Sequence, residues 1–359
     1  MKFSCDKYVL QQAAASAARA AAPKSPIAAL EGLLLEAGAD LRITGYDLKK
    51  AIYTNMEADI PEPGSVLVGA RLFCEMLRRM PDGIVTVEAE NGTVTVKCSR
   101  SAFNLVGMSA EDYPDLPSVE AENGVSLPQD LLKKMINECS FAVSTNESRP
   151  VYMGTLFEIA HNELTMVSVD GYRLALRREP VEGYGDDCSF IVPGTALSDL
   201  ERLCGDSDER VKMSVGSTVI LSRRLEGDFL NYKKAIPESF RITVKTARTD
   251  LLDVVERVSL IVDSKNNAPL RLTFRKDAID FVCTTPLGKA ADSCPCEGDG
   301  GDLEIGFNDH YLSDALKAAP ADELNVCLNT GSSPCIFVPA DGSDNFVYMV
   351  LPVRLRAGQ

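Results

Sequence analysis

Two stretches of the sequence, GVSLPQDLLKKMINECSFAVS at residues 124–144 and ITVKTARTDLLDVVERVSLIV at residues 242–262, follow the same pattern. Their apolar positions correspond at one constant offset, which pairs Leu131 with Leu251. A third stretch, KFSCDKYVLQQAAASAARAAA at residues 2–22, has the same order of features. Each stretch predicts a short strand followed by an amphipathic helix. Self-similarity at a spacing of about 120 residues indicates one structural unit repeated three times.

The segments after these helices also repeat. Each contains a strand, a hairpin partner and a third strand that leads into a second amphipathic helix, and paired strands follow. The clearest pair is IVTVEAENGTVTVKCS at residues 84–99, where alternating residues flank the turn-forming Asn91-Gly92. The predicted unit is β-α-β-β-β-α-β-β-β, an α+β domain with two helices packed on antiparallel sheet. Polar segments at 121–124 and 237–240 place the predicted domains at residues 1–121, 122–240 and 241–359.

The chain closes with the apolar run NFVYMVLPVRLRAGQ, from Asn345 to Gln359. Its aromatic and β-branched residues predict a final core strand, because a disordered end would lack such apolar area. Pro352 ends or edges the strand, since proline has no ladder donor. This pattern alone leaves open what the residues after Pro352 do.

Cysteine and histidine usage limits the chemistry that the chain can perform. The eleven cysteines lie singly in predicted helices and strands, which fits reduced, mostly buried thiols in a cytosolic protein. Cys294 and Cys296 form the one close pair, which we interpret as a chance feature of a loop. Two histidines, His161 and His310, are too few for a metal cluster or a histidine-activated nucleophile. We therefore expect no metal and no cofactor.

The charge and hydropathy of the chain exclude further classes. The alanine-rich stretch near the start is interrupted by Arg19 and predicts a helix rather than a signal peptide, and no segment predicts a membrane span. The net charge of -15 argues against a protein that holds nucleic acid by charge alone. The six predicted helical segments sum to zero charge, so the acidity lies on strands and loops. A surface shared by all six helices would be the least acidic one.

Several motifs, in order along the whole chain, resemble the bacterial DNA polymerase sliding-clamp family, the β subunit of the replicase. They are the opening MKF, LFCEMLRRMP at 72–81, SAFNLVGMSAEDYPDLP at 101–117, SVDGYRLAL at 168–176, FNDHYLSDAL at 307–316 and YMVLPVRL at 348–355. The resemblance implies a non-catalytic processivity factor built from three clamp domains. It also implies a head-to-tail homodimeric ring, with helices around a central hole through which duplex DNA threads independently of its sequence. A ring holds DNA by topology, so weak phosphate contact suffices and an acidic exterior is no objection.

The resemblance further implies a hydrophobic cleft that binds short linear peptides and includes the C-terminal tail. The implied partners are the replicative polymerase, the clamp loader, translesion polymerases and mismatch-repair proteins, met in the cytoplasm at replication forks of the nucleoid. An apolar pocket with a few polar groups suits an extended peptide with leucine and phenylalanine anchors. The implied deep subsite comprises Tyr152, Val169, Gly171, Tyr172, Arg173, Leu174, Leu230, Lys234, Ala235, Met349 and Leu351. The implied shallow subsite comprises Asn308, Tyr311, Pro352, Val353, Arg354 and Leu355.

The family pattern also assigns contacts with DNA and with a second copy of the chain. Lys24 and Arg149 fall at or beside DNA-contact positions. At the subunit junction, the first domain would contribute Phe103 and Leu105, and the third domain would contribute Ile261 and Val262. From the residues alone, these four side chains could equally be buried in their own cores. Likewise, Tyr172 and Arg173 alone would suggest an ordinary strand end after an Asp-Gly turn.

Two other classes of function remain as alternatives. A cytosolic enzyme with a cleft between repeats would need a nucleophile, an acid–base pair or a cofactor loop, and the sequence contains no GxGxxG, P-loop, HExxH or paired histidines. A clamp-like hub that binds peptides without encircling DNA would share the cleft but not the ring. Retention on circular DNA that is lost on linearisation separates this hub from a clamp.

Overall fold

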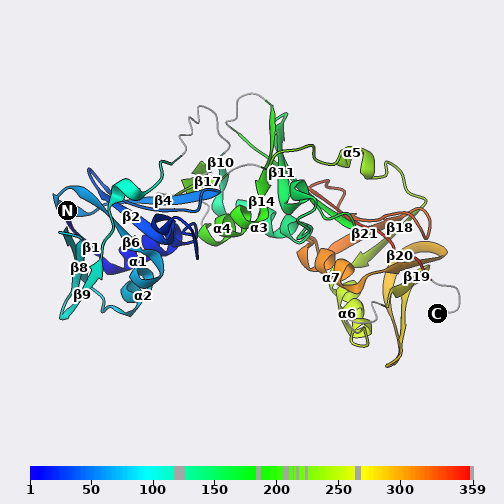
Figure 1. Cartoon of the computed structure of the whole chain (residues 1–359). Coiled ribbons are helices and arrows are strands. Elements are labelled where there is room, and N and C mark those ends of the chain that lie inside the picture. Colours follow the sequence, from blue (N-terminus) through cyan, green and yellow to red (C-terminus); the bar gives the residue numbers. More distant parts are fainter. Residues whose placement is uncertain are drawn as a thin grey trace. The chain divides into compact units, whose positions relative to one another are not determined.

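The computed structural model describes the chain except for residues 117–125, 183–186, 205–209, 213, 216–217, 223–224, 263–267 and 356–359. The described residues form two compact units, whose elements are labelled in Figure 1. Unit 1 comprises Met1–Leu132 and Ser198–Arg223, and unit 2 comprises Lys133–Leu197 and Arg224–Gln359. Helices α3 (Gln129–Ser140) and α4 (Gly194–Leu203) contribute residues to both units. The predicted domain boundary after residue 121 lies outside the described residues.

The first repeat lies in unit 1, and its opening helix is the predicted alanine-rich one. This helix begins after Asp6, whose carboxylate accepts hydrogen bonds from the backbone N–H groups of Tyr8 and Val9 at 2.8 and 3.3 Å. The elements of the repeat are β1 (Lys2–Asp6), α1 (Lys7–Ala18), the 3-10 turn η1 (Ala28–Glu31), β2 (Gly32–Ala37), β3 (Leu41–Tyr46), β4 (Lys50–Met56), β5 (Asp59–Glu62), β6 (Gly64–Gly69), α2 (Ala70–Arg79), β7 (Ile84–Glu90), β8 (Thr93–Cys98), β9 (Ser101–Val106) and η2 (Ala110–Asp112).

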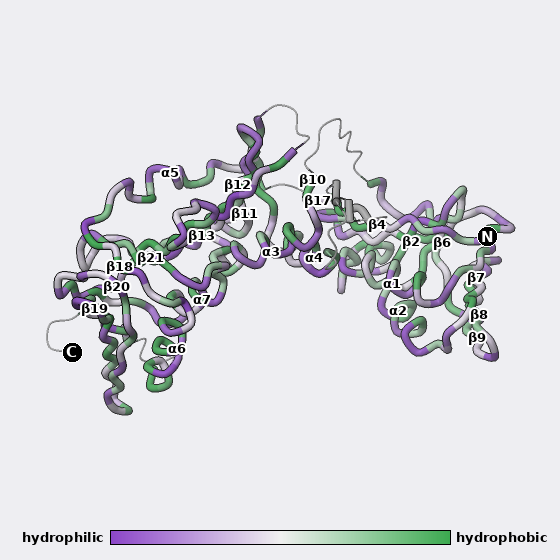
Figure 2. The backbone as a smooth tube through the Cα atoms, turned by 180° about the vertical axis from the view of Figure 1, so that it is seen from behind, coloured by the Kyte–Doolittle hydropathy of each residue, from purple (hydrophilic) through white to green (hydrophobic). Residues whose placement is uncertain are grey.

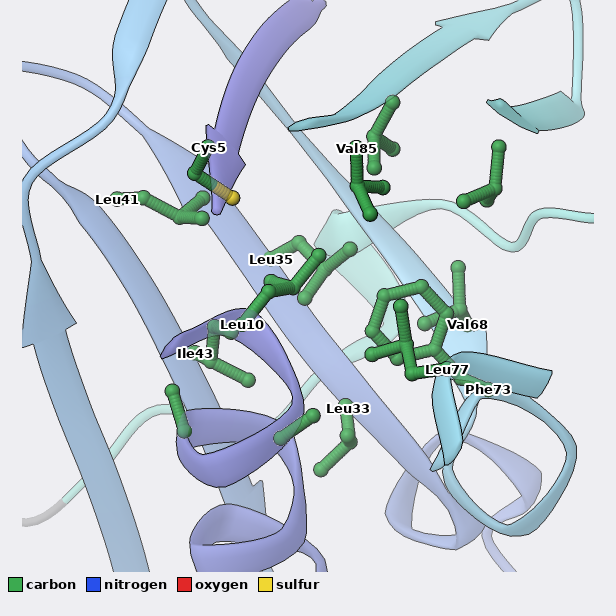
Figure 3. Packing of buried hydrophobic residues seen from close by; sticks show 14 of the residues in the cluster. Cys5, Leu10, Leu33, Leu35, Leu41, Ile43, Val68, Phe73, Leu77 and Val85 are labelled. Carbon is green, nitrogen blue, oxygen red and sulfur yellow. The ribbon is translucent and has the colours of Figure 1, made fainter. Parts of the chain in front are cut away.

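The core of this repeat lies between the two helices and the strands. Leu10 of α1 and Phe73 of α2 are fully buried and belong to one cluster with strand residues such as Leu35 and Val85 (Figure 3). Burial of such side chains contributes roughly 1.5–3 kcal/mol each. The sequence periodicity that predicted the helices therefore also selects the faces that form the core.

Two sheets pass through unit 1. The first has the strand order β5-β1-β7-β8-β9. Its β7–β8 hairpin turns at Asn91 and Gly92, which have positive φ angles of 49° and 75°, and this confirms the predicted hairpin. The second sheet has the order β10-β15-β16-β17-β4-β3-β2-β6. It adds to the first repeat the strands β10 (Ser126–Pro128), β15 (Arg210–Lys212), β16 (Ser214–Val215) and β17 (Thr218–Ser222).

Unit 2 contains one ten-stranded sheet with the order β14-β11-β12-β13-β23-β22-β21-β18-β20-β19. β13 pairs with β23, so the middle and last repeats share this sheet. The elements of the unit are η3 (Pro150–Met153), β11 (Gly154–Ala160), β12 (Glu163–Val169), β13 (Arg173–Pro180), β14 (Cys188–Pro193), α5 (Tyr232–Ala235), β18 (Ile242–Ala247), α6 (Arg248–Ser259), β19 (Leu270–Thr285), β20 (Gly288–Phe307), α7 (Asp309–Ala318), β21 (Glu323–Leu328), β22 (Cys335–Pro339) and β23 (Phe346–Val350).

The α+β class and the repeated order are as predicted, with one difference in strand number. Residues expected to form a single hairpin partner form two strands, β3 and β4 in the first repeat and β12 and β13 in the middle repeat, where the chain reverses at Asp170-Gly171. In the last repeat, the corresponding strands run together as the long β19 and β20, whose register shifts around Lys276. The segment between the two helices of a repeat therefore contains more strand structure than the sequence pattern predicted.

The C-terminal run forms the predicted core strand. β23 lies between β13 and β22, and its Phe346 and Tyr348 are fully buried. Figure 2 shows hydrophobic and hydrophilic residues interspersed along the strands, as expected where one sheet face packs inward. None of the helices in the described part of the chain is both long enough and apolar enough to cross a membrane.

Candidate functional site

The Asp170-Gly171 turn sets the geometry at the end of β12 and β13. The Asp170 carboxylate accepts hydrogen bonds from the backbone N–H groups of Tyr172 and Arg173, at 2.8 and 3.0 Å. Gly171 has a φ of +96°, a conformation that glycine adopts without steric cost. The turn therefore fixes the directions of the two side chains that the resemblance placed in the deep subsite.

Arg173 connects the middle repeat to the last one. Its guanidinium donates to Asp170 at 2.9 Å and to Asp314 of α7 at 2.5 Å. It also lies over the rings of Tyr311 and Phe141, at 4.7 and 5.5 Å from their centroids. Only 12% of its side chain is exposed, so its position is fixed by these contacts.

Tyr172 and Tyr311 form an aromatic platform on the surface. Their rings stack with centroids 5.7 Å apart and an interplanar angle of 19°, and Tyr172 remains 59% exposed. Asn308 caps α7 by accepting the Tyr311 backbone N–H at 3.1 Å, which positions that ring. Burial is the largest cause that raises the Tyr311 pKa, and the Asp170 carboxylate adds to it. The Tyr311 side chain thus stays neutral at ordinary pH, and its ring is available for apolar contact.

The deep-subsite residues predicted from the resemblance gather in one apolar cluster. Tyr232 of α5 is a buried member of this cluster, and Phe229 packs edge-to-face on Tyr152 with centroids 5.8 Å apart. Neither Tyr232 nor Phe229 was singled out from the sequence. Lys234 lies exposed on α5 beside the cluster. The predicted members brought together are Tyr152, Val169, Leu174, Leu230, Ala235, Met349 and Leu351.

The tail after β23 lies against the end of β20. The Val353 N–H donates to the Gly306 carbonyl at 2.9 Å, and the Leu351 N–H donates to the Tyr172 carbonyl at 2.8 Å. A Cβ atom at Gly306 would lie 2.7 Å from Leu355 Cδ2, so this glycine permits the close approach of the tail. The sequence signal that could have indicated this close approach was a glycine inside a strand. Pro352 is partly buried and Arg354 is exposed.

The predicted DNA contacts are both exposed. Lys24 lies in unit 1 after α1, and Arg149 of unit 2 precedes η3 with its guanidinium 5.9 Å from the Tyr152 ring centroid. Sequence reasoning did not single out Arg71, Arg78 and Arg79, which are exposed on α2. Their shared helix face was visible in the sequence as RLFCEMLRRM at residues 71–80.

The predicted junction residues occupy surface positions to different degrees. Phe103 is 42% exposed on β9, the edge strand of its sheet, whereas Leu105 is half-buried against the first core. Ile261 and Val262 follow α6 and are both partly exposed. The alternative that Phe103 is simply buried in the core of its own domain is therefore wrong. Two more exposed apolar residues flank these positions and were not predicted: Val106, 84% exposed, and Leu260, 83% exposed.

The cysteines require one correction. All eleven are free and most are buried, as expected, with Cys188 exposed. Cys294 and Cys296 were interpreted as a loop feature, but they lie in β20 and are 2% and 7% exposed. Two residues apart on a strand, their side chains point to the same face. Among the described residues, no cluster of ligands suited to a metal ion was found.

Three repeats of one α+β unit, together with an apolar cluster next to the Tyr172–Tyr311 pair and to Leu351 of the C-terminal tail, define a protein of the DNA-clamp class. Family models for the N-terminal, central and C-terminal domains of the DNA polymerase III β subunit match residues 1–117, 126–232 and 233–354. The chain belongs to this family, the bacterial β sliding clamps, which are non-catalytic processivity factors and not enzymes.

Individual relatives agree with this assignment over their full length. The chain is 31% identical to the β sliding clamp of Synechocystis and 29% identical to that of Bacillus subtilis, covering 99% of this chain and 100% of each relative. The crystal structure of the B. subtilis DNA polymerase sliding clamp superposes with a TM-score of 0.94 at 26% identity, over 99% of this chain and all of that one. A Eubacterium rectale structure described as a DNA polymerase III β subunit gives the same values.

Proposed function

We propose that two copies of this chain close head to tail into a ring around duplex DNA, and that the ring tethers replication and repair proteins through the cleft described above. The observation that carries this proposal is the apolar cluster with the fixed Arg173 and the Tyr172–Tyr311 pair beside it, which we interpret as the cleft. Its walls come from β13, α5, α7 and the tail, which are far apart in the sequence, and the site combines an apolar cluster with a few fixed polar groups. Such a site suits an extended peptide with leucine and phenylalanine anchors.

Two edge strands support ring closure. β9 ends the five-stranded sheet of unit 1, and β19 ends the sheet of unit 2. An exposed edge strand pairs readily with another chain, and β9 carries the exposed Phe103 and Val106. Pairing of β9 in one copy with β19 in the other, repeated about a two-fold axis, closes a dimer and removes both edges. Ile261 and Val262 would meet Phe103 and Leu105 at this junction.

The charge distribution supports a threaded duplex. Exposed arginines on α2 give that helix a basic face, although Glu75 pairs with Arg78 and Arg79 at 3.0 and 3.6 Å. The chain as a whole carries a net charge of -15, which disfavours DNA on its other surfaces. Lys24 and Arg149 would add weak phosphate contacts. Weak contacts permit sliding, while closure of the ring prevents dissociation.

The proposed partners are the replicative polymerase, the clamp loader, translesion polymerases and mismatch-repair proteins, at replication forks in the cytoplasm. The proposed domains are residues 1–121, 122–240 and 241–359. A hub that binds peptides without encircling DNA would use the same cleft. The two are separated by loading the protein onto a nicked circular plasmid with a clamp loader and ATP, and then cutting the plasmid. Release on cutting is expected of a ring, whereas unchanged retention contradicts it.

Truncation after Leu351 tests the cleft. This change keeps β23 and removes Pro352, Val353 and the residues that follow them. The variant should fold and dimerise, because the strand and its core contacts remain. Its affinity for a peptide with leucine and phenylalanine anchors should fall at least tenfold, about 1.4 kcal/mol, when titrated by calorimetry. Equal affinity in the folded variant would mean that the tail is only the end of a core strand.

A further inference from the structure

A second groove lies beside the deep subsite in unit 2. It has a volume of about 690 Å³ and is bordered by two strands of the sheet and by the segment that leads into α5. β11 and β14 contribute Leu156, Glu158, Phe190 and Ile191, and the facing segment runs from Leu225 to Lys233. We call it the flanking groove. Neither the sequence motifs nor the family pattern assigned it a role.

The floor of the flanking groove is continuous with the deep subsite. Leu156, Leu225, Phe229 and Leu230 line the groove and also belong to the apolar cluster that contains Val169 and Met349. Leu230 is the shared wall, since it is a predicted deep-subsite residue. A peptide whose anchor fills the deep subsite would therefore reach the flanking groove with its next residues.

The segment that forms the outer wall is held in place by Glu158. This carboxylate accepts hydrogen bonds from the Tyr232 hydroxyl at 3.2 Å and from the Lys233 ammonium. Burial is the largest cause that raises the Tyr232 pKa, and the nearby Glu158 charge raises it further. Because Tyr232 is buried in the apolar cluster, the wall of the groove and the deep subsite are fixed by the same contacts.

The rim of the flanking groove is acidic. Glu226 and Asp228 are exposed on either side of Gly227, and among the described residues neither carboxylate has an ion-pair partner within 4.0 Å. Among the described residues that line the groove, Lys233 is the only cation, and its ammonium is bonded to Glu158. The groove thus presents an apolar floor below two unpaired negative charges.

We propose that the flanking groove binds lysine or arginine residues located next to the anchor in a partner peptide. Long basic side chains bury an apolar stem while their charged ends remain in water, which matches an apolar floor and an acidic rim. This inference rests on the proposed peptide-binding function, and it adds a basic flank to the specificity of the same cleft.

The test compares three synthetic peptides by calorimetry at about 50 mM salt. One carries the leucine and phenylalanine anchor alone, one carries Arg-Lys-Arg after the anchor, and one carries it before the anchor. We expect one of the two extensions to tighten binding at least about fivefold, as two exposed ion pairs would. Equal affinity for all three peptides overturns the flanking-groove proposal. If the anchor peptide itself does not bind, the proposed peptide-binding function is overturned, and the flanking-groove proposal is overturned with it.

The variant E226K/D228K identifies the groove as the source of the gain. Both side chains are exposed, so the variant should fold with an unchanged Tm, and its affinity for the anchor peptide should match the wild type within about twofold. The gain from the basic extension should vanish. The control D40K/E57K makes the same change in net charge at exposed carboxylates of unit 1, and it should keep the gain. A gain that persists in E226K/D228K, or that is lost equally in the control, overturns the proposal.

Discussion

Replacing Gly306 with alanine tests whether the close approach of the tail to β20 builds the shallow subsite. The added Cβ would lie 2.7 Å from Leu355 Cδ2 and 2.9 Å from the Val353 carbonyl oxygen. Gly306 has an ordinary φ, so alanine itself fits the backbone. One of the two contacts is with backbone, and a rotamer change cannot relieve it. The tail must therefore move away from β20.

The expected losses of stability and of peptide affinity follow from the contacts that this movement of the tail breaks. Accommodating the extra methyl without movement would cost roughly 1–3 kcal/mol. Releasing the tail instead breaks the hydrogen bond from Val353 to Gly306, worth about 1 kcal/mol, in a partly exposed segment. Release is the cheaper response, so Tm should fall by no more than about 5 °C. Peptide affinity should fall about tenfold, because the displaced residues would form one wall of the proposed shallow subsite.

Calorimetric titration of an anchor peptide into the wild type, Gly306→Ala and Gly38→Ala measures the effect. Gly38 is the matched control, since nothing lies within 4 Å of its added Cβ. Combining Gly306→Ala with truncation after Leu351 should give no loss beyond the truncation alone, because both changes remove the same wall. Wild-type affinity in a folded Gly306→Ala variant, or a further tenfold loss in the truncated chain, would refute the reasoning.

Three other predictions concern the junction, the cleft and the thiols. Phe103→Asp and Ile261→Asp should each give a folded monomer in sedimentation, because an unpaired charge in a dry contact costs several kcal/mol, and an unchanged dimer in both would show that the junction is misplaced. Arg173→Lys should weaken peptide binding about fivefold or more, because an ammonium cannot donate to Asp170 and Asp314 while stacking on Tyr311; unchanged affinity would assign Arg173 a purely structural role. Burial raises the pKa of Cys5 to about 12, so its contribution to stability is complete below pH 9, where the unfolded thiol is neutral, and is lost as pH rises to 12. Accordingly, the unfolding free energy of Cys5→Ala should fall less steeply over that window than that of the wild type, by at most about 1.4 kcal/mol per pH unit, and parallel curves would contradict the assignment.

The sequence by itself determined the features that depend on near neighbours. The threefold repeat, the helix after Asp6, the hairpin at Asn91-Gly92 and the strand before Pro352 were all readable, because each depends on residues a few positions apart. The number of strands in each repeat was less readable. A continuous apolar segment such as LTMVSVDGYRLALR does not show by periodicity alone that it reverses at Asp170-Gly171.

The tertiary structure alone decided which distant residues meet. Arg173 and Asp314 are 141 positions apart, and their ion pair exists because β13 pairs with β23 and brings α7 to the end of β12. The resemblance named the cleft residues, but it gave no reason for Gly306, whose role appears only when the tail lies against β20. The flanking groove was also decided by the tertiary structure, since its floor comes from β11 and β14 and its acidic rim from the segment before α5. Local patterns fix which face of an element is apolar, whereas long-range strand pairing and packing fix what that face contacts.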